Sequence, residues 1–187
     1  MKKYIFTFIA LCFMSALISA QDKAKVDNDQ SYLILSTKRL KTMELELNEA
    51  SAKGYRVLYG APTTSYDMAV LLKRLDDTKS VPYTYKVLAT SLIKTMEKEL
   101  NENAAEGYRL LPRTIVFKAG LLAAELVTLM ERAPNSNVKY EYKLVGASRE
   151  TKLHELIDAA IAEGYTPTTM IRLGKAVVVM EKEIPAK

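Results

Sequence analysis

Acid–base and nucleophilic catalysis need titratable side chains in a fixed arrangement, and this 187-residue chain offers few of them. Its single histidine, His154, lies in a helical pattern with no histidine or cysteine companion at metal-ligand spacing. Its single cysteine, Cys12, lies near the N-terminus, and no serine stands in a GxSxG setting. A lone helical histidine of this kind is typical of a surface residue. We therefore predict that the protein is not an enzyme.

A carboxylate stripe is the other candidate for chemistry. Glu99, Glu102 and Glu106 fall at i, i+3 and i+7 on one face of a predicted helix. Carboxylates placed together can serve hydrolysis or bind a metal ion. However, this face flanks the apolar side of the helix, and Lys94 and Lys98 lie beside it. The pattern favours a solvated helix face, so we expect no metal site and no cofactor.

Phosphate and nucleic-acid binding also lack a clear signature. Gly146 and Gly174 are isolated glycines, without the multi-glycine spacing that lets several backbone amides approach a phosphate. The formal net charge of +5 comes from acidic and basic residues that are interleaved along the chain. Nucleic-acid binders instead gather basic residues into a patch or stripe. We predict that nucleic acid is not a partner.

The first twenty residues, MKKYIFTFIALCFMSALISA, have the pattern of a secretory signal peptide. Lys2 and Lys3 precede an apolar run that is shorter than a membrane span, and small residues follow it. Cleavage after Ala20 would lower the net charge from +5 to +3 and remove Cys12, leaving a fold held by its core alone. The alternative is an uncleaved N-terminal anchor. We predict export to the periplasm or medium, with no membrane span after cleavage.

The strand and helix patterns that would position any site occur three times in the sequence. A glycine–tyrosine pair recurs, and a further tyrosine stands 22 residues before each glycine, at the start of an alternating strand pattern such as YTYKVLAT. Between them, positions −14, −11, −7 and −3 from the glycine fall on one helix face. The pairs are Gly54–Tyr55, Gly107–Tyr108 and Gly164–Tyr165, and the helix positions hold Leu40, Met43, Leu47 and Ser51, then Ile93, Met96, Leu100 and Ala104, then Glu150, Leu153, Ile157 and Ile161.

After each glycine the chain predicts a strand (YRVLY, YRLLPRTIVF, YTPTTMIR), a turn and a strongly apolar strand (AVLLKRL, ELVTLMER, AVVVMEKE). Because consecutive apolar residues suit a strand covered on both faces, we place the last strand between the other two. The fold class is therefore α+β: three tandem β-α-β-β units with mainly antiparallel sheets, each with a helix on one face, packed together. The units span 31–75, 83–132 and 140–183, after a polar segment at 21–30.

The recurring glycine–tyrosine pair is interpreted as a helix stop. A helix commonly ends at a residue in the left-handed conformation, which glycine adopts at low cost. The tyrosine then packs back on the last helical turn, and the strand begins. Repetition of this pair therefore reports on the fold and does not indicate an active site.

The signature YxYKV, a helix ending in LNxxAAEGYRLL and an apolar strand ending in MER together resemble a family of short bacterial proteins of unknown function, each a single β-α-β-β unit. The resemblance covers nearly all of the chain after the signal segment and is best in the second copy. In the first copy Leu33 and Ile34 replace Lys-Val, and in the third copy Thr166, Pro167 and Thr168 follow the tyrosine. The resemblance implies the fold and no activity.

The second copy carries extra residues, because 23 residues separate Gly107 from Met130, against 16 between Gly164 and Met180. The insertion predicts a longer hairpin with an apolar tip and a turn near Gly120. Its candidate contact residues are Ile115, Val116, Phe117, Leu121 and Leu122. An exposed apolar patch of this kind marks a protein partner or self-association; the alternative is that it folds over a neighbouring unit.

We therefore predict an exported, non-catalytic binding or structural module of the bacterial envelope, with a protein partner or self-association through the hairpin. The rival hypothesis is a small-molecule binder or enzyme that uses a cleft between units. Tyrosines would line such a cleft, with Tyr66, Tyr85 and Tyr142 as the candidates.

Overall fold

The structure is a computed structural model that describes residues 30–63, 68–75, 81–118 and 125–184. The predicted signal segment and nearly all of the polar segment at 21–30 lie outside these ranges. The first unit contains β1 (Tyr32–Thr37), α1 (Leu40–Ala52), β2 (Tyr55–Pro62) and β3 (Met68–Arg74). The second contains β4 (Thr84–Thr90), α2 (Ile93–Ala105), β5 (Arg109–Leu110), the 3-10 helix η1 (Pro112–Thr114), β6 (Val116–Lys118) and β7 (Glu125–Arg132). The third contains β8 (Lys139–Ala147), α3 (Glu150–Ala162), β9 (Thr166–Leu173) and β10 (Lys175–Ile184).

Each unit folds into an antiparallel sheet whose last strand is central. The strand orders are β1-β3-β2, β4-β7-β5 and β8-β10-β9, with β6 also paired to β7. This confirms the α+β class and the central position predicted from the apolar run Val177–Val179. The physical reason is visible in β7, where Leu126 and Met130 pack in one core while Val127 and Leu129 pack in another.

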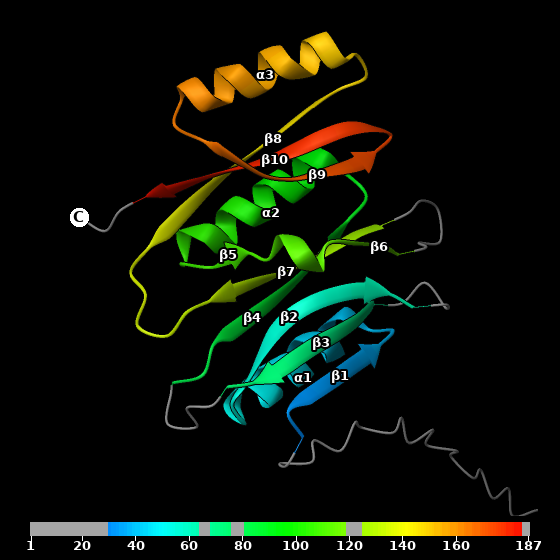
Figure 1. Cartoon of the computed structure of the whole chain (residues 1–187), viewed down its shortest axis with the longest axis vertical. Coiled ribbons are helices and arrows are strands. Elements are labelled where there is room, and N and C mark those ends of the chain that lie inside the picture. The colour runs from blue at the N-terminus through cyan, green and yellow to red at the C-terminus, as the bar shows by residue number, and fades with distance from the viewer. Residues whose placement is uncertain (1–29, 64–67, 76–80, 119–124, 185–187) are drawn as a thin grey trace, which may run out of the picture.

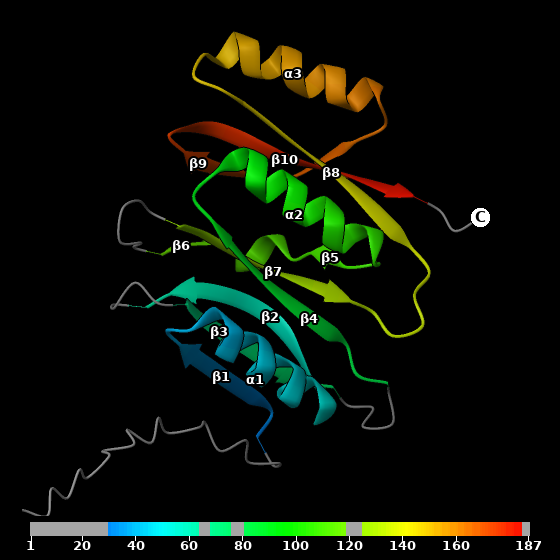
Figure 2. The ribbon, with the colours of Figure 1, turned by 180° about the vertical axis from the view of Figure 1, so that it is seen from behind.

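The units stack along the long axis of the molecule (Figure 1; Figure 2). Helix α1 packs against its own β1 and β2 and against β4 of the next unit, and α2 likewise contacts β4, β5 and β8. Helix α3 packs on β8, β9 and β10 of its own unit. Two of the three cores therefore contain residues of adjacent units, so burial itself holds the stack together. Among the described residues, no helix is long and apolar enough to cross a membrane.

The three helices end in the same way. Gly54, Gly107 and Gly164 have φ values of +87°, +90° and +92°, the left-handed conformation that favours glycine. In the third helix the N–H of Tyr165 donates to the carbonyl of Ala160, 3.1 Å away, a bond that closes the last turn. The tyrosine side chains that follow the three glycines are all buried.

Two local predictions are wrong. The strand expected across YRLLPRTIVF is broken by η1, because Pro112 has no N–H and the Thr114 hydroxyl takes over pairing, accepting from the N–H of Leu129 at 3.0 Å. Ile161, expected on the apolar side of the third helix, is 49% exposed. Helices α1 and α2 also pack on a strand of the next unit, whereas the contacts of α3 are with β8, β9 and β10 of its own unit.

Candidate functional site

The polar side chains that face neighbouring units are best understood from the strand edges they cover. Strand β4 is the edge of its sheet, and α1 lies beside that edge. The Asn48 amide accepts from the N–H of Tyr85 at 2.9 Å and donates to its carbonyl at 3.1 Å. In the next junction, Asn101 of α2 makes the same pair of bonds with Tyr142 of β8, both at 2.8 Å. A helix side chain thus replaces the missing neighbouring strand.

A glutamate one turn earlier in each helix extends this pattern. The Glu44 carboxylate accepts from the N–H of Val87 at 3.0 Å, and the Glu97 carboxylate accepts from the N–H of Leu144 at 2.6 Å. These acceptors are charged and the donors are backbone groups, so each bond is stronger than one between neutral partners. Glu97 is therefore a structural residue rather than a free acid or base.

A second network crosses each junction through side chains of the paired strands. The Tyr85 hydroxyl donates to Glu131 at 2.9 Å and accepts from the N–H of Val57 at 3.2 Å, while Arg56 donates to the same carboxylate at 2.7 Å. The next junction repeats this network with four equivalent residues at 2.7–2.8 Å, namely Tyr142, Glu181, Leu110 and Arg109. Both glutamates are 6% exposed.

The electrostatics keep these groups out of acid–base chemistry near neutral pH. Burial, and next the adjacent carboxylate, raise the pKa values of Tyr85 and Tyr142 far above the usual range, so both phenols stay protonated as donors. The hydrogen bond to the carboxylate raises the pKa of Arg56 and, in the same way, of Arg109. Each network is a neutral donor and a cation around one carboxylate, which is an arrangement that joins units.

The tyrosines proposed to line a cleft occupy these junctions. Tyr85 and Tyr142 are 1% and 2% exposed, so their rings fill the space between units. Tyr66 lies outside the described residues. An open hollow is found instead at another part of the second junction, where α2 begins.

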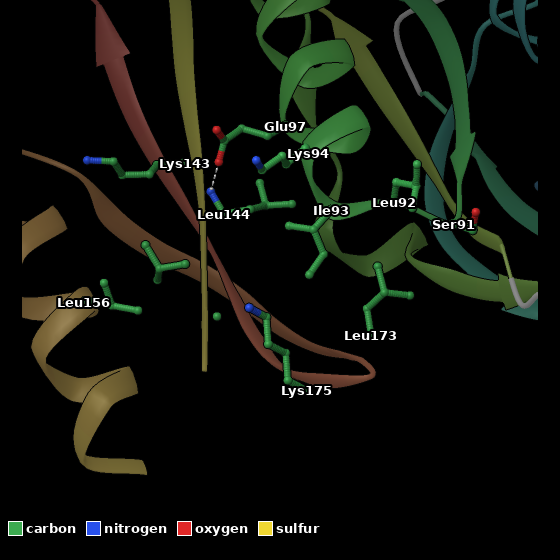
Figure 3. Close-up of a pocket in the computed structure, with 12 residues that line it drawn as sticks. Ser91, Leu92, Ile93, Lys94, Glu97, Lys143, Leu144, Leu156, Leu173 and Lys175 are labelled. Carbon is green, nitrogen blue, oxygen red and sulfur yellow. Dashed lines mark hydrogen bonds between the residues drawn. The ribbon is translucent and has the colours of Figure 1, made fainter. Parts of the chain in front are cut away.

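That hollow, here called the junction cavity, has a volume of about 700 Å³, which is within the range of small-molecule sites. Its walls come from the start of α2, the strand β8, the middle of α3 and the β9–β10 turn (Figure 3). The lining is mainly apolar, with three lysines and one glutamate; it comprises Ser91, Leu92, Ile93, Lys94, Glu97, Lys143, Leu144, Val145, Gly146, Leu156, Leu173 and Lys175.

The charges of the junction cavity are unevenly satisfied. Lys143 is paired with Glu163 at 2.6 Å, and Glu97 is held by the N–H of Leu144. Lys94 and Lys175 form no ion pair with any residue in the described part of the chain. In Figure 3 both side chains lie at the hollow, with that of Lys175 rising from the β9–β10 turn. The cavity is thus apolar with two unpaired cations at its wall.

The predicted hairpin residues lie in different environments. Val116 is 4% exposed and belongs to the core shared by the first two units, and Ile115 is partly buried. Phe117 is 37% exposed and lies on β6. Leu121 and Leu122 lie outside the described residues, as does the turn predicted near Gly120.

The remaining candidates lie on solvated helix faces. His154 is 3.7 Å from Glu150, and both side chains are largely exposed. Glu102 pairs with Lys98 at 3.7 Å, also in solvent, while burial raises the pKa of Glu99. Within the described ranges no three His, Cys, Asp or Glu side chains are grouped to hold a metal ion.

Comparison of the chain with protein-family models, with curated proteins and with solved structures gives no match. The resemblance to a family of single-unit proteins therefore stays a prediction. Sequence reasoning raised a cleft between units as the rival hypothesis but did not name the residues that line the junction cavity, and it missed the roles of Glu44, Asn48, Glu97 and Asn101. A signal was present for the latter, because both helices carry Glu and Asn at positions −10 and −6 from the glycine.

Proposed function

We propose that this chain is an exported, non-catalytic binding module of the bacterial envelope. The observation that supports it most is the use of the buried polar side chains. Tyr85, Glu131 and Arg56 bond to one another and to a backbone N–H, and the second junction repeats the arrangement. Such groups join units rather than react with a substrate.

A protein contact at β6 is the first candidate for such binding. Strand β6 pairs with β7 on one side only, so it is an edge strand of the second sheet. Phe117 on this strand is 37% exposed, and large aromatic side chains are common anchors of protein interfaces. A partner, or a second copy of the chain, would contact Phe117 together with the apolar residues predicted to follow it.

The test replaces Phe117 with Asp in the mature chain. We expect lost capture of the envelope partner, or lost self-association, with the thermal midpoint unchanged, because Phe117 is partly solvent-exposed. Met170→Asp is the matched control, since Met170 is 66% exposed on β9 of the third unit. A collapse of thermal stability in Phe117→Asp, or equal loss of binding in both variants, would reject the contact.

The junction cavity supports small-molecule binding as a second candidate function. Its volume of about 700 Å³ and its mainly apolar lining are features of ligand sites. It lies between the second and third units, where the rival hypothesis expected a cleft, although leucines and lysines line it rather than tyrosines. Its chemistry is specific enough to name a class of ligand.

A further inference from the structure

The edge of β8 continues past the last side chain of α2 that covers it. The N–H groups of Tyr142 and Leu144 point away from β10, and each is bonded to a side chain of α2. Because alternate N–H groups of an antiparallel strand point to the same side, the N–H of Gly146 faces the same edge. β8 pairs with β10 through Gly146 without a register shift. Gly146 is among the residues that line the junction cavity, and this alternation directs its N–H toward the same edge of β8 that α2 covers at Tyr142 and Leu144.

Gly146 also leaves no room for a side chain. A Cβ there would lie 2.9 Å from Val177 and 3.1 Å from the Cε of Lys175. The position therefore holds bare backbone close to a lysine stem. A ligand group can reach this N–H from the cavity, as the Glu97 carboxylate reaches the N–H of Leu144 two residues earlier.

We propose that the junction cavity binds a small amphipathic monocarboxylate, with the carboxylate at the N–H of Gly146 between Lys94 and Lys175 and the apolar tail against Leu92, Leu156 and Leu173. This inference rests on the second candidate function above. The carboxylate continues the pattern set by Glu97, in which an anion covers the edge of β8. Lys94 and Lys175, which have no ion-pair partner among the described residues, supply the charge that a buried carboxylate needs.

The apolar half of the ligand follows from the rest of the lining. Leu92 at the mouth is 63% exposed, an unfavourable position for a leucine that a ligand tail would shield. Leu173 at the end of β9 and Leu156 of α3 add further apolar lining, and Figure 3 shows Leu156 across the cavity from Leu92. A divalent or highly charged ligand fits less well, because Glu97 contributes a negative charge to the same wall.

Octanoate is the probe, titrated into the ¹⁵N-labelled mature chain below its micelle concentration and followed by amide chemical shifts. We expect a downfield shift of the Gly146 amide proton. Acetate and 1-octanol should each bind about tenfold more weakly, because each lacks one half of the ligand. Equal binding of octanol and octanoate, or an unmoved Gly146 amide, would overturn the proposal.

The matched variants are Lys94→Gln with Lys175→Gln, and, as a control, Lys41→Gln with Lys53→Gln. Lys41 holds the position in α1 that Lys94 holds in α2, 13 residues before the glycine, and lies outside the cavity. The first pair should weaken octanoate about tenfold with an unchanged melting midpoint, and the control pair should leave binding intact. Equal weakening in both pairs would show general attraction to a basic surface and reject the site. Failure here, with partner capture still lost in Phe117→Asp, would reject the ligand while the binding module stands.

Discussion

Replacing Tyr85 with Phe tests whether the buried network joins the first two units. The change removes one oxygen and keeps the ring. It leaves the N–H of Val57, in a residue 6% exposed, without its partner at 3.2 Å. It also takes one donor from the Glu131 carboxylate, which keeps Arg56. A buried donor without a partner costs about 1–3 kcal/mol and a lost bond to a charged acceptor adds to it, so we expect a loss of about 2–4 kcal/mol.

That loss is large beside the roughly 5–15 kcal/mol by which domains are stable, so urea unfolding followed by far-UV circular dichroism can resolve it. The chain has no tryptophan, which makes backbone signals the practical probe. Tyr142→Phe should cost a similar amount, since its hydroxyl has the same partners in the second junction. Tyr59→Phe is the control, because Tyr59 is 49% exposed and a surface change costs about 0.5 kcal/mol or less.

Hydrogen exchange separates a junction effect from general loosening. In a stack each unit interacts mainly with its neighbours, so Tyr85→Phe should speed exchange in the first sheet more than in the third. A cost near that of Tyr59→Phe, or uniform acceleration across the three sheets, would refute the reasoning about the network.

Three further predictions concern the cover of a strand edge, the dependence of stability on pH, and contacts between copies of the chain. Asn101→Asp should lower the free energy of unfolding by about 2–3 kcal/mol, because an aspartate cannot donate to the Tyr142 carbonyl. Asp158→Asn on α3 is the control and should change this free energy little, as urea unfolding would show. Burial, and then a hydrogen bond to Glu141, raise the pKa of Tyr165 to about 12, so stability present below the unfolded pKa near ~10 is lost as pH rises toward 12. Urea unfolding midpoints measured below about pH 10 and near pH 12 should fall less in Tyr165→Phe than in the unsubstituted protein. Sedimentation at rising concentration should show no end-to-end growth of stacked copies.

Much of the fold could be predicted because its causes are local. The run Val177–Val179 needs cover on both faces, which places its strand in the middle of the sheet. Gly107 stands where the backbone has φ of +90°, so the helix end follows from the residue type. Pro112 is a local signal for the break at η1, but the pairing that replaces the strand could not be predicted, because it depends on the Thr114 hydroxyl reaching the N–H of Leu129, 15 residues along the chain.

The candidate site was harder to predict because it has no motif of its own. The junction cavity exists where α2 begins and the β9–β10 turn ends, and these are brought together only by stacking. Lys94 and Lys175 are 81 residues apart and look like ordinary surface lysines in the sequence. By contrast, Asn48 and Asn101 recur at one helix position, so comparing units would have indicated their shared role.

The first unit lacks the residues that would receive another copy. In the second unit Tyr85 pairs in register with Glu131, the acceptor of the junction network. The same place in the first unit pairs Tyr32 with Lys73, which has no carboxylate to offer. Tyr32 is 52% exposed.

The last unit lacks the complementary set. Helices α1 and α2 each carry a Glu and an Asn that cover a strand edge. At the same two positions α3 carries His154 and Asp158, and an aspartate cannot donate to a backbone carbonyl. Three residues before the glycine, α1 and α2 carry the small residues Ser51 and Ala104, beside the strand of the next unit. Helix α3 carries the larger Ile161 at the same position. Thr166 stands where the first and second units carry Arg56 and Arg109 of the network. A head-to-tail contact that does not close into a ring would grow into a filament. Because the first and third units lack the groups that hold the two described junctions, we expect copies of the chain not to stack end to end.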